Sequence, residues 1–294
     1  MDDYIVRATA ANGYIRAFAG VTTNLVGEAQ RTHGLSPVAS AALGRTMTAA
    51  VMMGIDMKGD DHSLSITLKG GGPIGNVVTV TKSNGNTKGY VDNPSLQLPL
   101  NPMGKLDVAK AMGKQGKLTV IKDLGLKEPY AGQVDIVSGE IGEDIAYYMA
   151  VSEQKPSVVA LGVLVNPDAS IKAAGGFIIQ PLPGAPEKLI DTIENRVTQI
   201  SAVSSMVDEG KKPDEILEAI LGDMDLNIND RIYPMFLCDC SKERLEKVLL
   251  TIGREELEEI LEEDGHAELV CHYCNSTYDF DEKDIHGMIE NSKL

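Results

Sequence analysis

The four cysteines of this chain form two tight doublets, and this arrangement constrains its fold and chemistry more than any other feature. One doublet is Cys238-Asp239-Cys240 and the other is Cys271-His272-Tyr273-Cys274, with residues 241–270 between them. Such doublets suit either four thiolates around one metal ion or two short-range disulfides. The sequence does not choose between these uses, and it permits a protein that has one in each redox state.

A metal held by all four cysteines would have a structural or regulatory role. Four soft thiolates suit tetrahedral Zn²⁺ with bonds of about 2.3 Å, and an all-cysteine shell leaves no open position for a catalytic water. His266 and His272 are the nearby nitrogen ligands, but with four cysteines present we expect surface or outer-shell roles for them. On the chemistry alone, a purely structural zinc site is the simplest interpretation.

The same thiolates are also the species that oxidants attack. Oxidation of one doublet would remove two ligands and should release the metal. Because zinc binding contributes on the order of 10 kcal/mol of folding free energy in small zinc peptides, its loss should unfold a small domain built around the cysteines.

Charge argues against nucleic acid as a partner. The formal net charge is −16, and residues 233–294 carry 16 Asp and Glu against 6 Lys and Arg, a local charge of −10. Modules that bind nucleic acid need a cationic surface, so a nucleic-acid-binding zinc ribbon is a poor alternative.

The N-terminal sequence MDDYIVRATA has no basic segment followed by an apolar run, and no stretch approaches 18 apolar residues. We therefore expect no signal peptide, no membrane span and a cytoplasmic protein. In that reducing compartment, clustered cysteines bind metals or sense redox state more often than they form structural disulfides.

The first 180 residues predict an α+β core domain. Asn12-Gly13 and Asn84-Gly85-Asn86 each separate β-rich runs, which is typical of hairpins. A helix is expected over Val38–Met57, with Ser36 as N-cap, and its near absence of charge predicts burial on most sides. A second, amphipathic helix is expected over Ser138–Gln154. Further strands are predicted at Ser63–Leu68, Leu118–Leu124, Gly132–Val137, Ser157–Val165 and Ile171–Gln180.

The segment Pro181–Pro186, with three prolines, marks a domain boundary. Apolar spacing after it predicts helices over Glu187–Glu209 and Pro213–Leu221, whose wide apolar stripes should pack on the core domain. We therefore predict a core domain at 1–180, a helical linker layer at 181–230 and a small C-terminal metal-binding domain at 231–294.

Two acidic helices are expected between the doublets of this last domain, and a zinc-ribbon hairpin is expected around the second doublet. The few large side chains of this domain indicate a core too small to be stable without a bound metal ion or disulfides. These large side chains are Tyr233, Phe236, Tyr273, Tyr278 and Phe280.

Other chemistries have little support in the sequence. Lys69-Gly70-Gly71-Gly72-Pro73 lacks the Gly-Lys-Ser/Thr of a phosphate loop and is better interpreted as a turn. No Ser-His-Asp set, His-Glu-x-x-His or Walker motif is evident. A thiol–disulfide oxidoreductase would need a cysteine pair on a thioredoxin-like βαβ unit, which neither doublet has. We therefore predict that the chain is not an enzyme.

Several segments together resemble the 33-kilodalton heat-shock protein family, in the right order over essentially the whole chain. They are EPYAGQVDIVSGEIGEDIAYYMAVSEQKPS at 128–157, FLCDC at 236–240 followed by CHYC at 271–274, ANGYIRAFA at 11–19, and HGLSPVASAALGR at 33–45. This resemblance implies a redox-regulated, ATP-independent holdase of the bacterial cytosol that acts under oxidative stress.

In that family the reduced, zinc-bound form is inactive. The resemblance implies one Zn²⁺ per chain on Cys238, Cys240, Cys271 and Cys274, and disulfides Cys238–Cys240 and Cys271–Cys274 after oxidation. Zinc then leaves, the C-terminal domain and linker unfold, and a homodimer binds unfolding proteins. The zinc would then be regulatory rather than purely structural.

The resemblance leaves the surface that binds unfolding proteins open between the core and the linker. Four methionines of the first predicted helix could offer adaptable contacts there, although packing in the core is the simpler interpretation. They are Met47, Met52, Met53 and Met57.

Overall fold

The computed structural model describes residues 2–57, 59 and 61–291, and it consists of two compact units, Met1–Leu237 and Cys238–Leu294. The predicted α+β class is confirmed. The second unit begins seven residues later than the predicted boundary, because residues up to Phe236 pair with strands of the first unit. The predicted linker helices also belong to the first unit.

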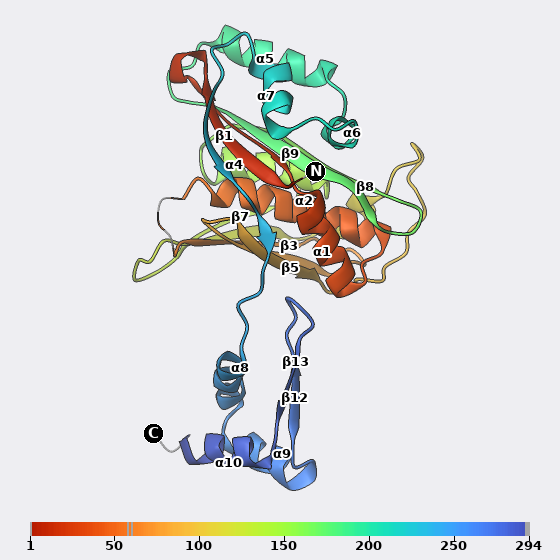
Figure 1. Ribbon diagram of the computed structural model, residues 1–294, viewed down its shortest axis with the longest axis vertical. Coiled ribbons are helices and arrows are strands. Elements are labelled where there is room, and N and C mark those ends of the chain that lie inside the picture. Colours follow the sequence, from red (N-terminus) through yellow and green to blue (C-terminus); the bar gives the residue numbers. More distant parts are fainter. Residues whose placement is uncertain (1, 58, 60, 292–294) are drawn as a thin grey trace. The chain divides into compact units, whose positions relative to one another are not determined.

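The first unit contains two sheets with a long helix between them (Figure 1). The first sheet has the strand order β10-β1-β2-β9-β8, and all its neighbours are antiparallel. The second has the order β11-β5-β4-β3-β6-β7, with only the β11–β5 pair parallel. The strands are β1 (Tyr4–Ala10), β2 (Ile15–Val21), β3 (Ser63–Lys69), β4 (Asn76–Lys82), β5 (Asn86–Val91), β6 (Lys117–Asp123), β7 (Tyr130–Asp135), β8 (Val158–Val165), β9 (Ile171–Pro181), β10 (Asn227–Ile232) and β11 (Met235–Phe236).

Helix α2 (Pro37–Gly54) lies between the two sheets and contacts both. The side chain of Ser36 caps it by accepting from the N–H of Ala39, as the sequence predicts. All its residues except Pro37 and Arg45 are buried, because its surface is mostly apolar on all sides and it packs between two sheets. Met47, Met52 and Met53 lie inside this core, whereas Met57 lies beyond the end of α2 and is half-buried, so the core interpretation holds for the three methionines of the helix.

Three further helices of the first unit contact this core. Helix α4 (Ile141–Val151), shorter than predicted, contacts α2 and the edge strands β7 and β8. Helices α1 (Thr23–His33) and α3 (Val108–Met112) were not predicted. The short 3-10 turn η1 (Ala11–Gly13) joins β1 to β2.

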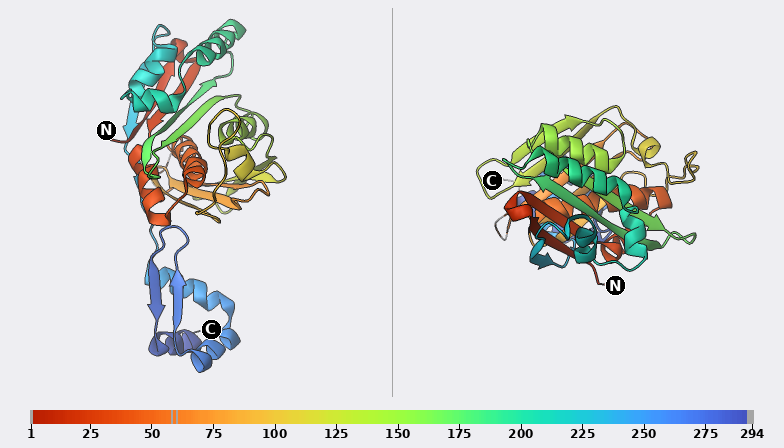
Figure 2. Two further views of the ribbon diagram at one scale, coloured as in Figure 1. Left: turned by 90° about the vertical axis from the view of Figure 1, so that its right-hand side faces the viewer. Right: turned by 90° about the horizontal axis from the view of Figure 1, so that it is seen from above.

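Three helices cover the other face of the first sheet, away from α2 (Figures 1 and 2). They are α5 (Glu187–Gln199), α6 (Val203–Asp208) and α7 (Pro213–Leu221). We call these residues, 187–221, the helical layer. Its buried side chains form a second core with β1, β2 and β9, as the wide apolar stripes predict.

The prediction of one helix over Glu187–Glu209 is wrong. The backbone becomes extended at Ile200 and Ala202, so α5 ends and α6 begins in a new direction. A continuous helix of that length would run about 34 Å in one line. The break instead lets α6 contact β8 and β9, with Val203 and Met206 buried against the sheet.

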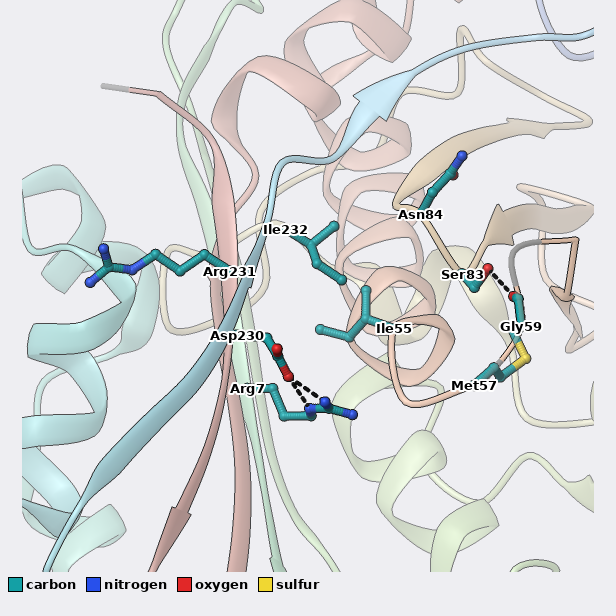
Figure 3. A pocket seen from close by; sticks show the side chains of 9 residues that line it. All are labelled: Arg7, Ile55, Met57, Gly59, Ser83, Asn84, Asp230, Arg231 and Ile232. Atoms are coloured by element: carbon teal, nitrogen blue, oxygen red, sulfur yellow. Dashed lines mark hydrogen bonds and ion pairs between the residues drawn. The ribbon is translucent and has the colours of Figure 1, made fainter.

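An extended segment, residues 227–236, pairs with one edge strand of each sheet. Strand β10 pairs with β1, and β11 pairs with β5. Figure 3 shows the ion pair between Asp230 and Arg7, and Ile232 pointing toward Ile55 beside a cleft of about 330 Å³. We call residues 227–236 the strap. Most of its side chains are exposed, so backbone pairing holds it.

The second unit has a small core of its own. Its elements are α8 (Lys242–Leu249), the 3-10 turn η2 (Leu250–Ile252), α9 (Arg254–Glu263), β12 (Ala267–Val270), β13 (Thr277–Phe280) and α10 (Glu282–Asn291). The predicted acidic helices and the hairpin are confirmed. The buried side chains of this apolar core are Leu249, Leu257, Phe280, Ile285, Met288 and Ile289. Tyr233 and Phe236, expected in this core, belong to the first unit instead. In the described part of the chain, no helix has the length and apolarity to span a bilayer.

A buried ion pair joins Glu153 to Lys122 of β6, and Lys155 lies 3.2 Å from the other carboxylate oxygen of Glu153. Burial raises the pKa of the Glu153 carboxyl, but hydrogen bonds and charges from the two lysines outweigh burial and lower it overall. Such a carboxyl adds stability above its unfolded-state pKa of about 4.3, and this stability is lost as pH falls through the lowered folded-state pKa.

Glu153→Gln is therefore expected to lower the free energy of unfolding of the first unit by about 3 kcal/mol at pH 7. The difference from wild type should shrink as the pH is lowered from 7 to about 3. Urea unfolding followed by circular dichroism at both pH values measures it. The control is Glu28→Gln, which removes the exposed ion pair with Arg31 and should lower the free energy of unfolding by less than about 1 kcal/mol. An equal loss at both pH values would contradict an ionic contribution.

Candidate metal centre

The second doublet lies in the turn of the β12–β13 hairpin. The N–H of Cys271 donates to the carbonyl of Ser276 (2.9 Å), and the N–H groups of Cys274 and Asn275 both donate to the carbonyl of Cys271 (3.3 and 2.8 Å). Asn275 has a φ of 56°, a left-handed conformation that Asn tolerates better than most residues. This tight turn brings the two sulfurs of Cys271 and Cys274 to the same side.

The first doublet directly precedes α8. Ser241 caps this helix, because its hydroxyl oxygen accepts from the N–H of Arg244 at 3.3 Å. Arg244 in turn pairs with Asp239 at 3.0 Å, so the residue between the two cysteines is tied to the first turn of the helix. The helix start therefore determines where Cys238 and Cys240 lie.

The structure brings all four predicted cysteines together. Their Sγ atoms all lie within 4.8 Å of one another. The Sγ atoms of Cys240 and Cys274 lie 3.3 Å apart, and those of Cys238 and Cys271 lie 3.8 Å apart. A tetrahedron with zinc–sulfur bonds of about 2.3 Å has sulfurs about 3.8 Å apart, so the four sulfurs fit a tetrahedral metal ion.

Neither histidine belongs to this cluster. His266 and His272 are absent from the metal-ligating groups that the described residues form. The Nδ1 atom of His266 lies 3.0 Å from the carbonyl oxygen of Asp264, and His272 is exposed. The donor set is four sulfurs, which agrees with the surface or outer-shell roles expected for the histidines.

The sulfurs differ in their surroundings. Burial raises the pKa of the Cys271 thiol, which is the most buried of the four, although the N–H of Tyr273 donates to it. Burial also acts on Cys274, but hydrogen bonds from the hydroxyl and N–H of Ser276 outweigh it and lower the pKa of Cys274 to about 7. The Ser276 hydroxyl lies 3.3 Å from this sulfur.

Tyr278 is a residue whose place at the site was not predicted. Its hydroxyl lies 3.1 Å from Sγ of Cys240 and donates to the carbonyl of the same residue at 3.2 Å. The hydrogen bond to Cys240 raises the pKa of Tyr278 to about 12, so the phenol is protonated at neutral pH. The sequence predicts Tyr278 as one of the few large side chains of this domain and Ser276 as part of the hairpin, but neither as a residue of the site. The hairpin register could have indicated this position. Tyr278 pairs with Leu269, and so lies beside the strand that leads to Cys271.

The fold and the site define an α+β protein with a separate C-terminal unit that can hold a metal ion on four cysteines. The model of the Hsp33 protein family matches residues 3–281. A 33 kDa chaperonin of Clostridium botulinum is 51% identical over 292 residues, covering 99% of both chains. One from Bacillus subtilis is 50% identical, covering 97% of this chain and 98% of the relative.

The structure also superposes on the crystal structure of a 33 kDa chaperonin (heat shock protein 33 homolog) from Thermotoga maritima. The TM-score is 0.91, the sequence identity is 35%, and the match covers 99% of both chains. The chain therefore belongs to the Hsp33 family. This is a family of chaperones and not of enzymes.

Proposed function

We propose that this protein is a redox-regulated, ATP-independent holdase of the cytoplasm, inactive while its cysteines are reduced and bind one Zn²⁺ per chain. The observation that carries the proposal is the single cluster of Cys238, Cys240, Cys271 and Cys274 in a chain that matches the Hsp33 family over nearly its whole length. The clients are unfolding proteins, and the active form is a homodimer.

The cysteines both hold the metal and react with the oxidant. Bound zinc would supply the free energy that keeps a unit with six buried core side chains folded. When a peroxide oxidises a thiolate, the sulfur bonds to one peroxide oxygen, the O–O bond breaks and hydroxide leaves. A neighbouring thiolate then attacks the sulfenic sulfur, the S–S bond forms and a second hydroxide leaves. Each such disulfide removes two ligands.

The disulfides we propose are Cys238–Cys240 and Cys271–Cys274. The family resemblance and the short spacing within each doublet support this pairing. Close sulfur contacts also join cysteines of different doublets, Cys240 with Cys274 and Cys238 with Cys271. All four sulfurs are close enough that the pairing depends on how the chain moves once zinc has left. Peptide mapping of the oxidised protein by mass spectrometry identifies the bonds that form.

Unfolding of the second unit would act on the first through the chain itself. Only Leu237 separates Cys238 from the strap, which pairs with β1 and β5 and contacts the helical layer through the Arg231–Asp214 ion pair of 2.6 Å. The helical layer covers an apolar face of the first sheet that includes Val6, Ile15 and Phe177. If the strap and the layer are released, this face becomes available to unfolding clients.

Oxidation is expected to convert the protein from an inactive to an active holdase. The reduced, zinc-loaded protein is treated with hydrogen peroxide at raised temperature, zinc release is followed with a chromogenic chelator, and light scattering follows aggregation of a denatured client. We expect one zinc released per chain and aggregation suppressed only after oxidation, with reversal by dithiothreitol. Equal suppression before and after oxidation would rule out the switch.

A further inference from the structure

The Tyr278 hydroxyl joins the two halves of the cysteine cluster. It is on β13 of the hairpin that carries the second doublet, yet it contacts Cys240 of the first doublet, 38 residues away in sequence. Its oxygen lies 3.1 Å from Sγ of Cys240 and 3.2 Å from the carbonyl oxygen of that residue. When Cys240 is a thiolate its sulfur can only accept, so the hydroxyl hydrogen then has two acceptors on one cysteine, of which the thiolate is the stronger.

The hydrogen-bond contacts of Cys271 and Cys274 come from neighbouring residues in the sequence. The backbone N–H of Tyr273 donates to Cys271, the N–H of Ser276 donates to Cys274, and the Ser276 hydroxyl lies 3.3 Å from the Cys274 sulfur. These donors belong to the same turn as the cysteines that they contact. The donor to Cys240 comes from another element and is a single oxygen, which can be removed without altering the turn or the tyrosine ring.

A hydrogen bond to a thiolate changes its reactivity as well as its position. Attack on a peroxide uses a sulfur lone pair, and a donated hydrogen bond stabilises the negative charge on that sulfur. Thiolate nucleophilicity falls as the charge is stabilised, with a Brønsted slope of about 0.4–0.5. Hydrogen bonds to sulfur likewise tune the properties of metal–thiolate sites.

We propose that the Tyr278 hydroxyl limits the rate at which peroxides oxidise Cys240, and so sets how readily the cluster responds to an oxidant. Tyr278 acts through the cysteine and is a positioning residue. In the oxidation step, the Cys240 sulfur bonds to a peroxide oxygen while the O–O bond breaks and hydroxide leaves. The hydroxyl of Tyr278 opposes this step because its hydrogen bond to the thiolate is lost when sulfur becomes neutral. This inference rests on the proposed zinc-bound, oxidation-sensitive state.

The test compares Tyr278→Phe with wild type, both as full-length, reduced, zinc-loaded protein. Phenylalanine keeps the ring, which packs against the small core of the second unit. Losing one hydrogen bond to a charged sulfur should speed peroxide-driven zinc release by about 3- to 10-fold. The readouts are the rate of zinc release against peroxide concentration and the rate of sulfenic acid trapping at Cys240, followed by mass spectrometry.

Two controls separate reactivity from simple weakening of the site. Tyr273→Phe removes a hydroxyl from the second doublet but keeps the N–H that donates to Cys271, and it should react at the wild-type rate. Zinc transfer to a chelator without peroxide measures how firmly the metal is held. In Tyr278→Phe it should change less than peroxide-driven release does.

Several outcomes would overturn the inference. One is an unchanged rate of sulfenic acid formation at Cys240 in Tyr278→Phe. Another is zinc loss that is equally accelerated with and without peroxide, since the hydroxyl would then only hold the site together. If peroxide fails to release zinc even from wild type, the proposed function fails and this inference with it. If wild type responds and Tyr278→Phe matches it, only the role of Tyr278 is refuted.

Discussion

Cys271→Ser is expected to abolish stoichiometric zinc binding and to unfold the second unit without any oxidant. Cys271 is the most buried of the four cysteines, and its sulfur lies 3.8 Å from that of Cys238. A serine hydroxyl is a poor zinc ligand beside three thiolates, so the site loses a large part of a binding free energy on the order of 10 kcal/mol. The core of six buried side chains cannot replace that contribution.

Metal analysis of the purified protein and its thermal unfolding measure this result. We expect less than one zinc per chain and loss of the unfolding transition of the second unit, whereas the core of the first unit still unfolds cooperatively. His272→Ala is the matched control, because it changes the adjacent residue and removes the histidine that could have served as an alternative ligand. It should keep one zinc per chain. A Cys271→Ser protein with full zinc and an unchanged second unit would refute the four-cysteine site.

Leu217→Asp is expected to make the reduced, zinc-loaded protein suppress client aggregation. Leu217 of α7 is fully buried in the core between the helical layer and the first sheet. Loss of the leucine and burial of a carboxylate should together cost about 4 kcal/mol or more of docking free energy. The layer should then leave the sheet and expose the apolar face that includes Val6 and Phe177.

Light scattering of a denatured client and binding of an apolar fluorescent dye test this expectation under reducing conditions. Ala219→Asp introduces the same carboxylate on an exposed position of α7 and should behave as wild type. Zinc content should stay at one per chain in both variants, since neither touches the cysteine cluster. If Leu217→Asp binds the dye but does not suppress aggregation, the covered face of the sheet is not where clients bind.

Elements with a strong local pattern could be predicted from the sequence. Helix α2 follows from a run of residues behind Ser36 in which only Arg45 is charged, and the hairpins follow from Asn-Gly turns and from the alternation of apolar residues. The strap could not be predicted in this way. Its strand β10 has the polar sequence NINDRI and is held by backbone pairing with β1, which leaves no side-chain pattern. The break between α5 and α6 was missed for a related reason, because the apolar spacing continues through it.

The sequence by itself determined which residues can form the metal centre, because the chain has only four cysteines. Two helices and the strand β12 separate the two doublets along the chain. Only the tertiary structure decided that the four sulfurs lie within 4.8 Å of one another and that the Tyr278 hydroxyl lies 3.1 Å from one of them. The physical reason is that ligand identity is a property of side chains, whereas proximity depends on packing. The same packing decided that residues 227–236, which only Leu237 separates from the first cysteine, belong to the first unit.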